Sequence, residues 1–217
     1  MVTRRAMGLL VFTAACCVLI AIAGGGVAFV QRPVGVTYLV LWSGWWLVIA
    51  VGRRRGVKSA YDKSQRTVLA LGVLALIGLI LLPPWEYAHF AGPIPRDGLL
   101  AWAGLCLFAA GIVLQSAAFR SLRGFYTSRL GIQPGHRLVT GGPYRWVRHP
   151  GYLSNLVCLA GMGLALSSIA GLILTVFVVP LVVWRIAREE EMLVAEFGKA
   201  YQVYRQQTRW RLIPSIY

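Results

Sequence analysis

The sequence predicts an all-α polytopic membrane protein with about six transmembrane helices, of which the last two form a helix hairpin. Composition is the first reason: 58% of the 217 residues are hydrophobic and only 13% are charged, whereas a soluble domain usually carries about 25% charged residues. The second reason is that long apolar runs recur along the chain. Runs near the roughly 20 residues that cross a bilayer core are typical of membrane helices, so we expect a single integral domain.

Four apolar runs predict the first four helices, at residues 7–30, 34–52, 67–84 and 98–119. The third run ends at Pro83 and Pro84, and because proline disrupts a helix interior, we expect the third helix to stop there. These helices make up an N-terminal region, residues 1–119, in which no residue pattern points to chemistry. The remaining residues, 120–217, form a second region with a different character.

A fifth apolar run, residues 153–184, is too long for one crossing. Ser167, Ser168 and Gly171 near its middle favour a turn, so the run predicts two helices in a tight hairpin. Pro150 is well placed as the first residue of this hairpin, since proline is tolerated in the first turn of a helix. After the hairpin, residues 188–207 place apolar side chains at helical spacing among charges, which predicts an amphipathic helix at the membrane interface.

The formal net charge of +15 is unevenly distributed. If the N-terminus is cytoplasmic, twenty of the 22 Lys and Arg residues fall on the cytoplasmic side, and only Arg32 and Arg96 fall outside. Such an excess fixes orientation, so we expect both termini in the cytoplasm. The same basic face would favour anionic lipid headgroups. Because topology accounts for these charges, we do not expect nucleic-acid binding.

One polar cluster precedes the hairpin. Arg148 and His149 stand directly before Pro150, so their side chains would lie beside the unpaired amide groups of a helix N-terminus. This position attracts anions, and a carboxylate or a phosphate would suit it. A basic cap at the membrane surface explains the same residues equally well.

A second polar cluster follows the hairpin, where four of the seven acidic residues lie between residues 189 and 196. Carboxylates brought beside Tyr144 and Tyr152 would suit a cation. A site that takes both an anion and a cation matches S-adenosylmethionine, with its carboxylate, ammonium and sulfonium groups. A zwitterionic lipid headgroup fits equally well, and a plain surface ion pair with Arg185 would explain Glu189.

The second region resembles the isoprenylcysteine carboxyl methyltransferase family from about residue 120 to residue 214. Five segments carry the resemblance in order: 135–140 (GHRLVT), 142–144 (GPY), 148–152 (RHPGY), 185–193 (RIAREEEML) and 197–204 (FGKAYQVY). The resemblance implies an integral-membrane S-adenosylmethionine-dependent methyltransferase. It also implies an all-helical fold with the cofactor pocket and active site on the cytosolic face, no Rossmann domain and no metal.

The resemblance assigns roles to eleven residues. Eight would line the S-adenosylmethionine site: His136, Leu138, Val139, Tyr144, His149, Pro150, Tyr152 and Glu189. Backbone groups of Leu138 and Val139 would hold the adenine. Three residues would take catalytic roles: Arg185 would hold the methyl acceptor, Arg148 would order the loop or the cofactor carboxylate, and Glu190 would close the pocket wall.

The sequence constrains the identity of the methyl acceptor less than that of the methyl donor, S-adenosylmethionine. The resemblance favours a hydrophobic or lipid-linked carboxylate, which is ionised at pH 7 and needs no general base. An amine, as in phospholipid N-methylation, or a thiol would need a base, with His149 or Glu190 as candidates. The first region carries no acceptor signature, so the methylated atom stays open.

Two alternatives belong to other functional classes. The ending 210–217 (WRLIPSIY) resembles the tail of membrane sterol reductases, which bind NADPH, although the 135–139 segment favours the methyltransferase. A non-catalytic lipid-binding membrane protein is the second alternative. The presence of Arg185, His149 and Glu189 argues against a dead site, by analogy with the family.

Overall fold

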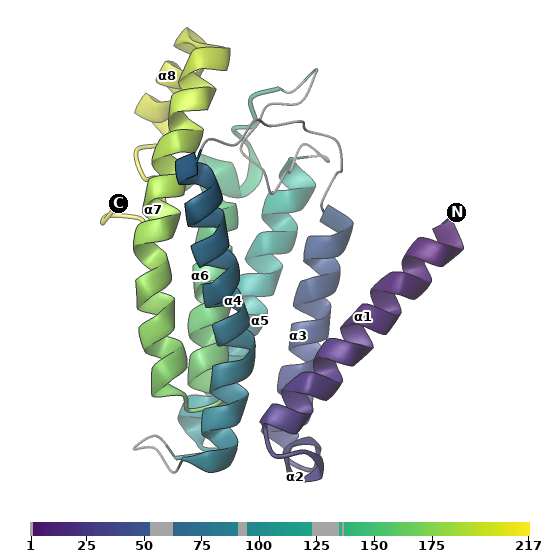
Figure 1. Cartoon of the computed structure of the whole chain (residues 1–217). Helices are drawn as coiled ribbons and strands as arrows, with labels where there is room; N and C mark the ends of the chain where they lie inside the picture. The colour runs from purple at the N-terminus through teal and green to yellow at the C-terminus, as the bar shows by residue number, and fades with distance from the viewer. Residues whose placement is uncertain (1, 53–62, 91–94, 123–134, 136) are drawn as a thin grey trace.

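The structure is a computed structural model, and it describes the chain except residues 1, 53–62, 91–94, 123–134 and 136. Over the described residues it contains eight α-helices and one short 3-10 helix. Their bounds are α1 Val2–Ala23, α2 Val27–Val30, α3 Pro33–Gly52, α4 Lys63–His89, α5 Leu99–Ser121, η1 Gly142–Arg145, α6 Pro150–Ala165, α7 Ile169–Phe197 and α8 Lys199–Gln207. The long helices run up and down in one bundle, while α1 leans away from it toward its N-terminus (Figure 1).

Four helices are long and apolar enough to cross a membrane: 33–52, 67–89, 99–121 and 169–197. The all-α polytopic fold predicted from the sequence is therefore confirmed. The apolar part of α1 (17 residues from Met7 to Ala23) and α6 (16 residues) are shorter. The finer prediction of six crossings is not decided by length and composition alone.

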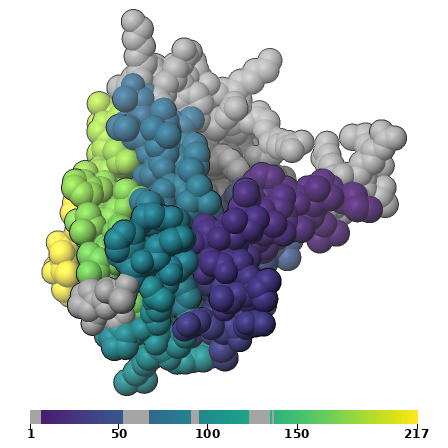
Figure 2. Space-filling model, turned by 60° about the horizontal axis from the view of Figure 1, so that its bottom comes forward, coloured from purple at the N-terminus to yellow at the C-terminus, as the bar shows by residue number. Residues whose placement is uncertain are grey.

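Large apolar side chains cover much of the bundle's outside. Leu10, Val113 and Phe177 are each more than 60% exposed, as expected of a surface that faces lipid rather than water. The space-filling view shows α1 projecting from the side of the bundle (Figure 2). Inside, Tyr38, Trp42 and Phe108 are almost fully buried, so aromatic side chains of α3 and α5 form part of the core.

Helices α5 and α6 pack at close range, which fixes the position of the α6 N-terminus. A Cβ atom added at Gly104 of α5 would lie 2.3 Å from the backbone nitrogen of Ala165, and one at Gly161 of α6 would lie 2.5 Å from that of Phe108. Small residues allow membrane helices to approach in this way. Higher up the same interface, the buried Gln115 donates to Asn155 at 2.7 Å.

The hairpin prediction is confirmed. Helix α6 begins at Pro150, and the turn between α6 and α7 contains Ser167 and Ser168. Ser167 has a φ of 53°, and the Ser168 hydroxyl accepts the amide N–H of Gly171 as an N-cap. The carboxylate of Glu86 accepts hydrogen bonds from the Ser168 hydroxyl and from two amides of the first α7 turn, so α4 anchors this end of the hairpin.

Three helix boundaries differ from the sequence prediction. The first apolar run breaks at Gly24–Gly26 into α1 and α2, with Gly25 and Gly26 at positive φ. The third helix does not stop at Pro83 and Pro84. Helix α4 continues to His89, because the turn after the prolines is held by Glu86, bound to α7, and by Tyr87, which donates to Asp97 at 2.6 Å.

The third difference concerns the amphipathic segment 188–207. Its first half continues α7 without interruption, and the helix ends before Gly198, which has a φ of 50°. Only Lys199–Gln207 forms the separate helix α8. At 1.5 Å per residue, the 29 residues of α7 extend about 43 Å, which exceeds the roughly 30 Å apolar core. The end of α7 therefore projects beyond the membrane-spanning part of the bundle.

Candidate active site

The chain end folds back over the start of α6. Trp210 and Arg211 follow α8, and their carbonyl oxygens accept the backbone N–H groups of Arg148 and His149, both at 2.9 Å. Leu212 is buried with Leu156 of α6 and Ile186 of α7. This arrangement brings the RHPGY segment, the α7 carboxylates and the chain's last ten residues together at one end of the bundle.

Glu190 lies at the centre of this end and is 4% exposed. One carboxylate oxygen accepts from Arg148 Nε at 2.8 Å and lies 3.3 Å from His149 Nε2. The other oxygen accepts from Arg211 Nε at 3.1 Å. A buried carboxylate with two guanidinium partners is fully used as an acceptor, and removing it would leave both cations without a counter-charge.

Arg148 connects this cluster to the chain end. Its Nη1 donates to the carbonyl oxygens of Thr208 and Arg209 at 2.8 and 2.7 Å. With Glu190 on its Nε, the guanidinium orders the segment after α8. The roles predicted for Arg148, ordering of the cofactor loop or contact with the cofactor carboxylate, stay predictions.

A second chain of contacts lies beside the first, on the same turn of α7. Arg185 Nε donates to the hydroxyl of Tyr152 at 2.8 Å, and this hydroxyl donates to Glu189 Oε2 at 2.7 Å. The structure thus brings together three residues predicted for the site, from α6 and α7. Among the described residues, Glu189 Oε1 has no hydrogen-bond donor, so Glu189 differs from its saturated neighbour Glu190.

The start of α6 leaves backbone donors beside these side chains. Pro150 is buried at the first position, and the amides of Tyr152 and Leu153 both return to the His149 carbonyl. Among the described residues the Gly151 amide has no acceptor, and a Cβ added there would meet no atom within 4 Å. A free helix N-terminus next to open space is suited to a carboxylate group.

The remaining predicted residues lie in the segment that leads to α6. Leu138 and Val139 are half-buried in irregular backbone, and His136 lies outside the described residues. Tyr144 lies in η1, and its carbonyl accepts the hydroxyl of Tyr204 at 2.7 Å. Burial raises the pKa of Tyr204 to about 12, so this hydroxyl is a neutral donor at ordinary pH.

The structure also holds residues that the sequence argument did not assign to the site. Arg211 and Thr208 bind Glu190 and Arg148 although they lie more than fifteen residues beyond the carboxylates. Residues 210–217 resemble a reductase tail, and the methyltransferase resemblance extends to about residue 214 without assigning these residues a role. The available signal was a basic residue, Arg211, in a segment that follows a reversal of the chain. Its partner, Glu190, could not be predicted from sequence spacing.

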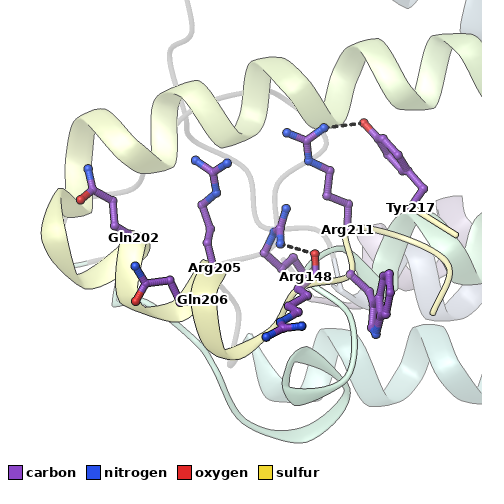
Figure 3. A pocket seen from close by; sticks show the side chains of 8 residues that line it. Arg148, Gln202, Arg205, Gln206, Arg211 and Tyr217 are labelled. Carbon is purple, nitrogen blue, oxygen red and sulfur yellow. Dashed lines mark hydrogen bonds between the residues drawn. The ribbon is translucent and has the colours of Figure 1, made fainter. Parts of the chain in front are cut away.

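The described residues form an open pocket of about 690 Å³ at this end of the bundle (Figure 3). Of the eleven predicted site residues, only Arg148 lines it. The other lining residues come from α8 and the chain end: Gln202, Arg205, Gln206, Arg209, Trp210, Arg211 and Tyr217. This basic pocket is therefore distinct from the Arg185–Tyr152–Glu189 chain.

Comparison with known proteins extends the match beyond the motifs. The phospholipid methyltransferase family model matches residues 99–200. A probable protein-S-isoprenylcysteine O-methyltransferase of Oryza sativa subsp. indica is 29% identical over 181 residues, which cover 77% of this chain and 88% of the rice protein. Delta(14)-sterol reductase of Mus musculus is 32% identical over 85 residues, but the match spans 38% of this chain and a fifth (20%) of the reductase.

A solved structure shares the fold. The eukaryotic intramembrane Ras methyltransferase, isoprenylcysteine carboxyl methyltransferase, superposes with a TM-score of 0.66 at 24% identity, covering 94% of this chain and 74% of the other. The long rice alignment, the family model and this common architecture all agree with the ordered motifs around α6 and α7. The chain is therefore similar to isoprenylcysteine carboxyl methyltransferases over most of its length, and to the phospholipid methyltransferase family over residues 99–200.

Proposed function

We propose that the chain transfers a methyl group from S-adenosylmethionine to the carboxylate of a hydrophobic or lipid-linked acceptor. The observation that carries the proposal is the Arg185–Tyr152–Glu189 chain beside the free start of α6. It places the Arg185 guanidinium, the Glu189 carboxylate and backbone N–H donors together where α6 begins and the apolar part of α7 ends. These groups complement both a zwitterionic donor and an anionic acceptor.

The residues present fit S-adenosylmethionine by charge. Its carboxylate would meet the Gly151 amide at the α6 N-terminus, and its ammonium would meet the free oxygen of Glu189. Leu138 and Val139 would hold the adenine. S-adenosylmethionine supplies an electrophilic methyl group on sulfur, and the protein has only to align it with the acceptor and to exclude water.

Arg185 would orient the acceptor. A carboxylate acceptor is already ionised at neutral pH, so the reaction needs a cation that holds one oxygen while the other attacks. Arg185 stands at the end of the apolar part of α7, where a lipid tail could stay in the membrane and the carboxylate could reach the site. This placement supports the catalytic role that the family resemblance implies.

The geometry favours a carboxylate over an amine or a thiol as the acceptor. A general base must have a free acceptor atom, and both oxygens of Glu190 are taken by Arg148, His149 and Arg211. His149 faces the same carboxylate. The rice relative is named for isoprenylcysteine O-methylation, and an isoprenylated protein with a terminal carboxylate is the acceptor class that we propose here.

Topology completes the proposal. With α1, α3, α4, α5, α6 and α7 all crossing the membrane, both termini and the active site lie on the cytosolic side. The basic residues support this orientation, because only Arg32 and Arg96 fall at the opposite end. An isoprenylated protein made in the cytosol would meet the site directly.

The first test is calorimetric titration of the detergent-purified protein with S-adenosylhomocysteine, with NADPH titrated in parallel. We expect micromolar binding of S-adenosylhomocysteine and none of NADPH. The 85-residue match to the sterol reductase makes NADPH the informative competitor. Binding of NADPH alone would assign the chain to the reductases, and binding of neither by folded protein would favour a lipid-binding scaffold.

A second test identifies the methylated atom. The protein is incubated with methyl-labelled S-adenosylmethionine and either an S-isoprenylated cysteine or phosphatidylethanolamine. A carboxylate product is a methyl ester, which base releases as volatile methanol, whereas an N-methyl group resists base. We expect label in the base-labile fraction from the isoprenylated cysteine; base-stable label in the phospholipid would overturn the carboxylate assignment.

A further inference from the structure

The basic pocket at the chain end is not needed for the proposed methyl transfer. Its volume of about 690 Å³ is in the range of small-molecule sites. Figure 3 shows Gln202, Arg205 and Gln206 on α8, and Arg148 and Arg211 across from them. We call the lining residues of α8 together with Arg209 the rim of the pocket, and Arg148 and Arg211, which bind Glu190, its floor.

The pocket carries a net positive charge. On the floor, Arg148 and Arg211 share the single carboxylate of Glu190. Arg205 and Arg209 on the rim are exposed, and neither has a carboxylate within salt-bridge distance among the described residues. Four guanidinium groups thus line the pocket, and two of them are paired with the Glu190 carboxylate.

Helix α8 is held so that its polar face stays over the pocket. Tyr201 and Tyr204 are nearly fully buried, and Tyr204 is fixed by its bond to the Tyr144 carbonyl. Gln202, Arg205 and Gln206 are three and four residues apart, so they share one helix face. Their side chains bring amide and guanidinium donors to the rim.

The pocket lies at the level expected for lipid headgroups. Its floor belongs to the segment that packs Leu212 against Leu156 and Ile186, at the edge of the apolar part of the hairpin. Beside it, Trp210 is 38% exposed and Ile216 is 77% exposed. Exposed aromatic and aliphatic side chains next to arginines are typical of a surface that sits in the membrane interface.

We propose that this pocket binds the phosphate group of an anionic phospholipid. Guanidinium groups bind phosphate oxygens in a bidentate manner, and Gln202 and Gln206 supply neutral donors for the rest of a headgroup. The neighbouring Trp210 and Ile216 would lie against the acyl region. Bound lipid would hold α8 and the chain end, and thereby the Glu190 cluster, against the membrane.

The test measures lipid binding directly and does not depend on methyl transfer. The detergent-purified protein is mixed with equal amounts of phosphatidylglycerol and phosphatidylcholine of identical acyl chains, and bound lipid is counted by native mass spectrometry. We expect preferential binding of phosphatidylglycerol. A juxtamembrane arginine contributes about 1 kcal/mol to anionic lipid binding, so Arg205→Gln with Arg209→Gln should reduce the preference about tenfold or more.

The control removes the same charge elsewhere. Arg120→Gln with Lys199→Gln replaces two exposed cations outside the pocket and should leave the preference unchanged. An equal loss in both double variants would overturn the proposal, because the effect would then belong to total charge. The single variant Arg209→Gln, with an expected loss of about fivefold from one such contact, serves if the double variant melts at a lower temperature.

Two competitors separate the possible sources of the bound group. Inorganic phosphate at millimolar concentration should not displace phosphatidylglycerol; full displacement would mean that the pocket takes a soluble phosphate, and the lipid assignment would fail. S-adenosylhomocysteine should not displace it either. Displacement by S-adenosylhomocysteine would assign the pocket to the cofactor and overturn the proposal, whereas failure of the methyltransferase assay alone would leave the lipid result standing.

Discussion

The two ends of the helix bundle both use buried or half-buried acidic residues, but in different ways. At one end, Glu86 binds Ser168 and the start of α7, and Asp97 accepts from Tyr87 and Arg32. At the other end, Glu190 is saturated by Arg148, His149 and Arg211, while one oxygen of its neighbour Glu189 has no donor within the part of the chain that the structure describes. The first end only joins helices, whereas the second joins helices and also leaves polar groups available.

The comparison teaches which acidic residues hold the fold and which can act on a ligand. A carboxylate whose oxygens are all taken contributes to stability, and its loss should not change ligand affinity directly. A carboxylate that is positioned by one bond and free at its second oxygen is pre-organised for a ligand. Substitutions at Glu190, Arg185, Glu189 and Glu86 test this division.

The largest effect is expected from Glu190→Gln. The substitution leaves Arg148 and Arg211 without a counter-charge in a buried cluster, and loss of one partner of a buried ion pair costs about 3–5 kcal/mol. The apparent free energy of unfolding in a denaturant titration should fall by this amount. Glu191→Gln is the control, because Glu191 is exposed and pairs with the exposed Arg188; equal effects would show that the cluster is not structural.

Arg185→Ala should reduce turnover at saturating cofactor by about 10²–10³-fold, as the loss of an electrostatic contact to the reacting group does. The affinity for S-adenosylhomocysteine should change by less than about threefold, because Tyr152 keeps its hydrogen bond to Glu189. For scale, a tenfold change in affinity corresponds to about 1.4 kcal/mol. Steady-state kinetics and calorimetry measure the two quantities.

Arg188→Ala, three residues along the same helix and exposed, provides the matched control for Arg185. It should leave both turnover and affinity near the wild-type values. If Arg185→Ala instead lowers cofactor affinity while saturated turnover stays normal, Arg185 belongs to the donor site and not to the acceptor site.

Glu189→Gln should weaken S-adenosylhomocysteine binding about tenfold, which corresponds to about 1.4 kcal/mol. The amide still accepts the Tyr152 hydroxyl bond, so the substitution removes the negative charge that would face the cofactor ammonium. Calorimetry measures the change, and thermal unfolding should stay close to that of the wild type. Unchanged affinity would remove Glu189 from the cofactor site.

The sequence predicted features that depend on neighbouring residues. Pro150 as the first residue of a helix, and the turn at Ser167 and Ser168, were correct because local backbone preferences decide them. Pro83 and Pro84 misled the prediction, since the contacts of Glu86 with a helix eighty residues away keep α4 continuous beyond the prolines. Distant contacts of this kind leave no mark on local spacing.

The site follows the same division. The ordered motifs identified Arg185, Tyr152 and Glu189, and the structure brings them together. The family resemblance assigned Glu189 and Glu190 different roles, but local spacing did not show that Glu190 is saturated by hydrogen-bond donors, because adjacent residues on a helix differ only in the direction that they face. Which of the two is saturated depends on Arg211, and its position follows from the chain reversal after Gly198.

The smallest effect tests the far end of the bundle. Glu86→Gln weakens the charge-assisted bonds to Ser168 and the first α7 turn, and a carboxylate at a helix N-terminus contributes about 0.3–1 kcal/mol. The free energy of unfolding should fall by about this amount, while the affinity for S-adenosylhomocysteine stays at the wild-type value. A loss of cofactor affinity here would mean that the hairpin transmits strain from one end to the other. The two ends would then form one cooperative unit, and Glu86 would take part in positioning the site.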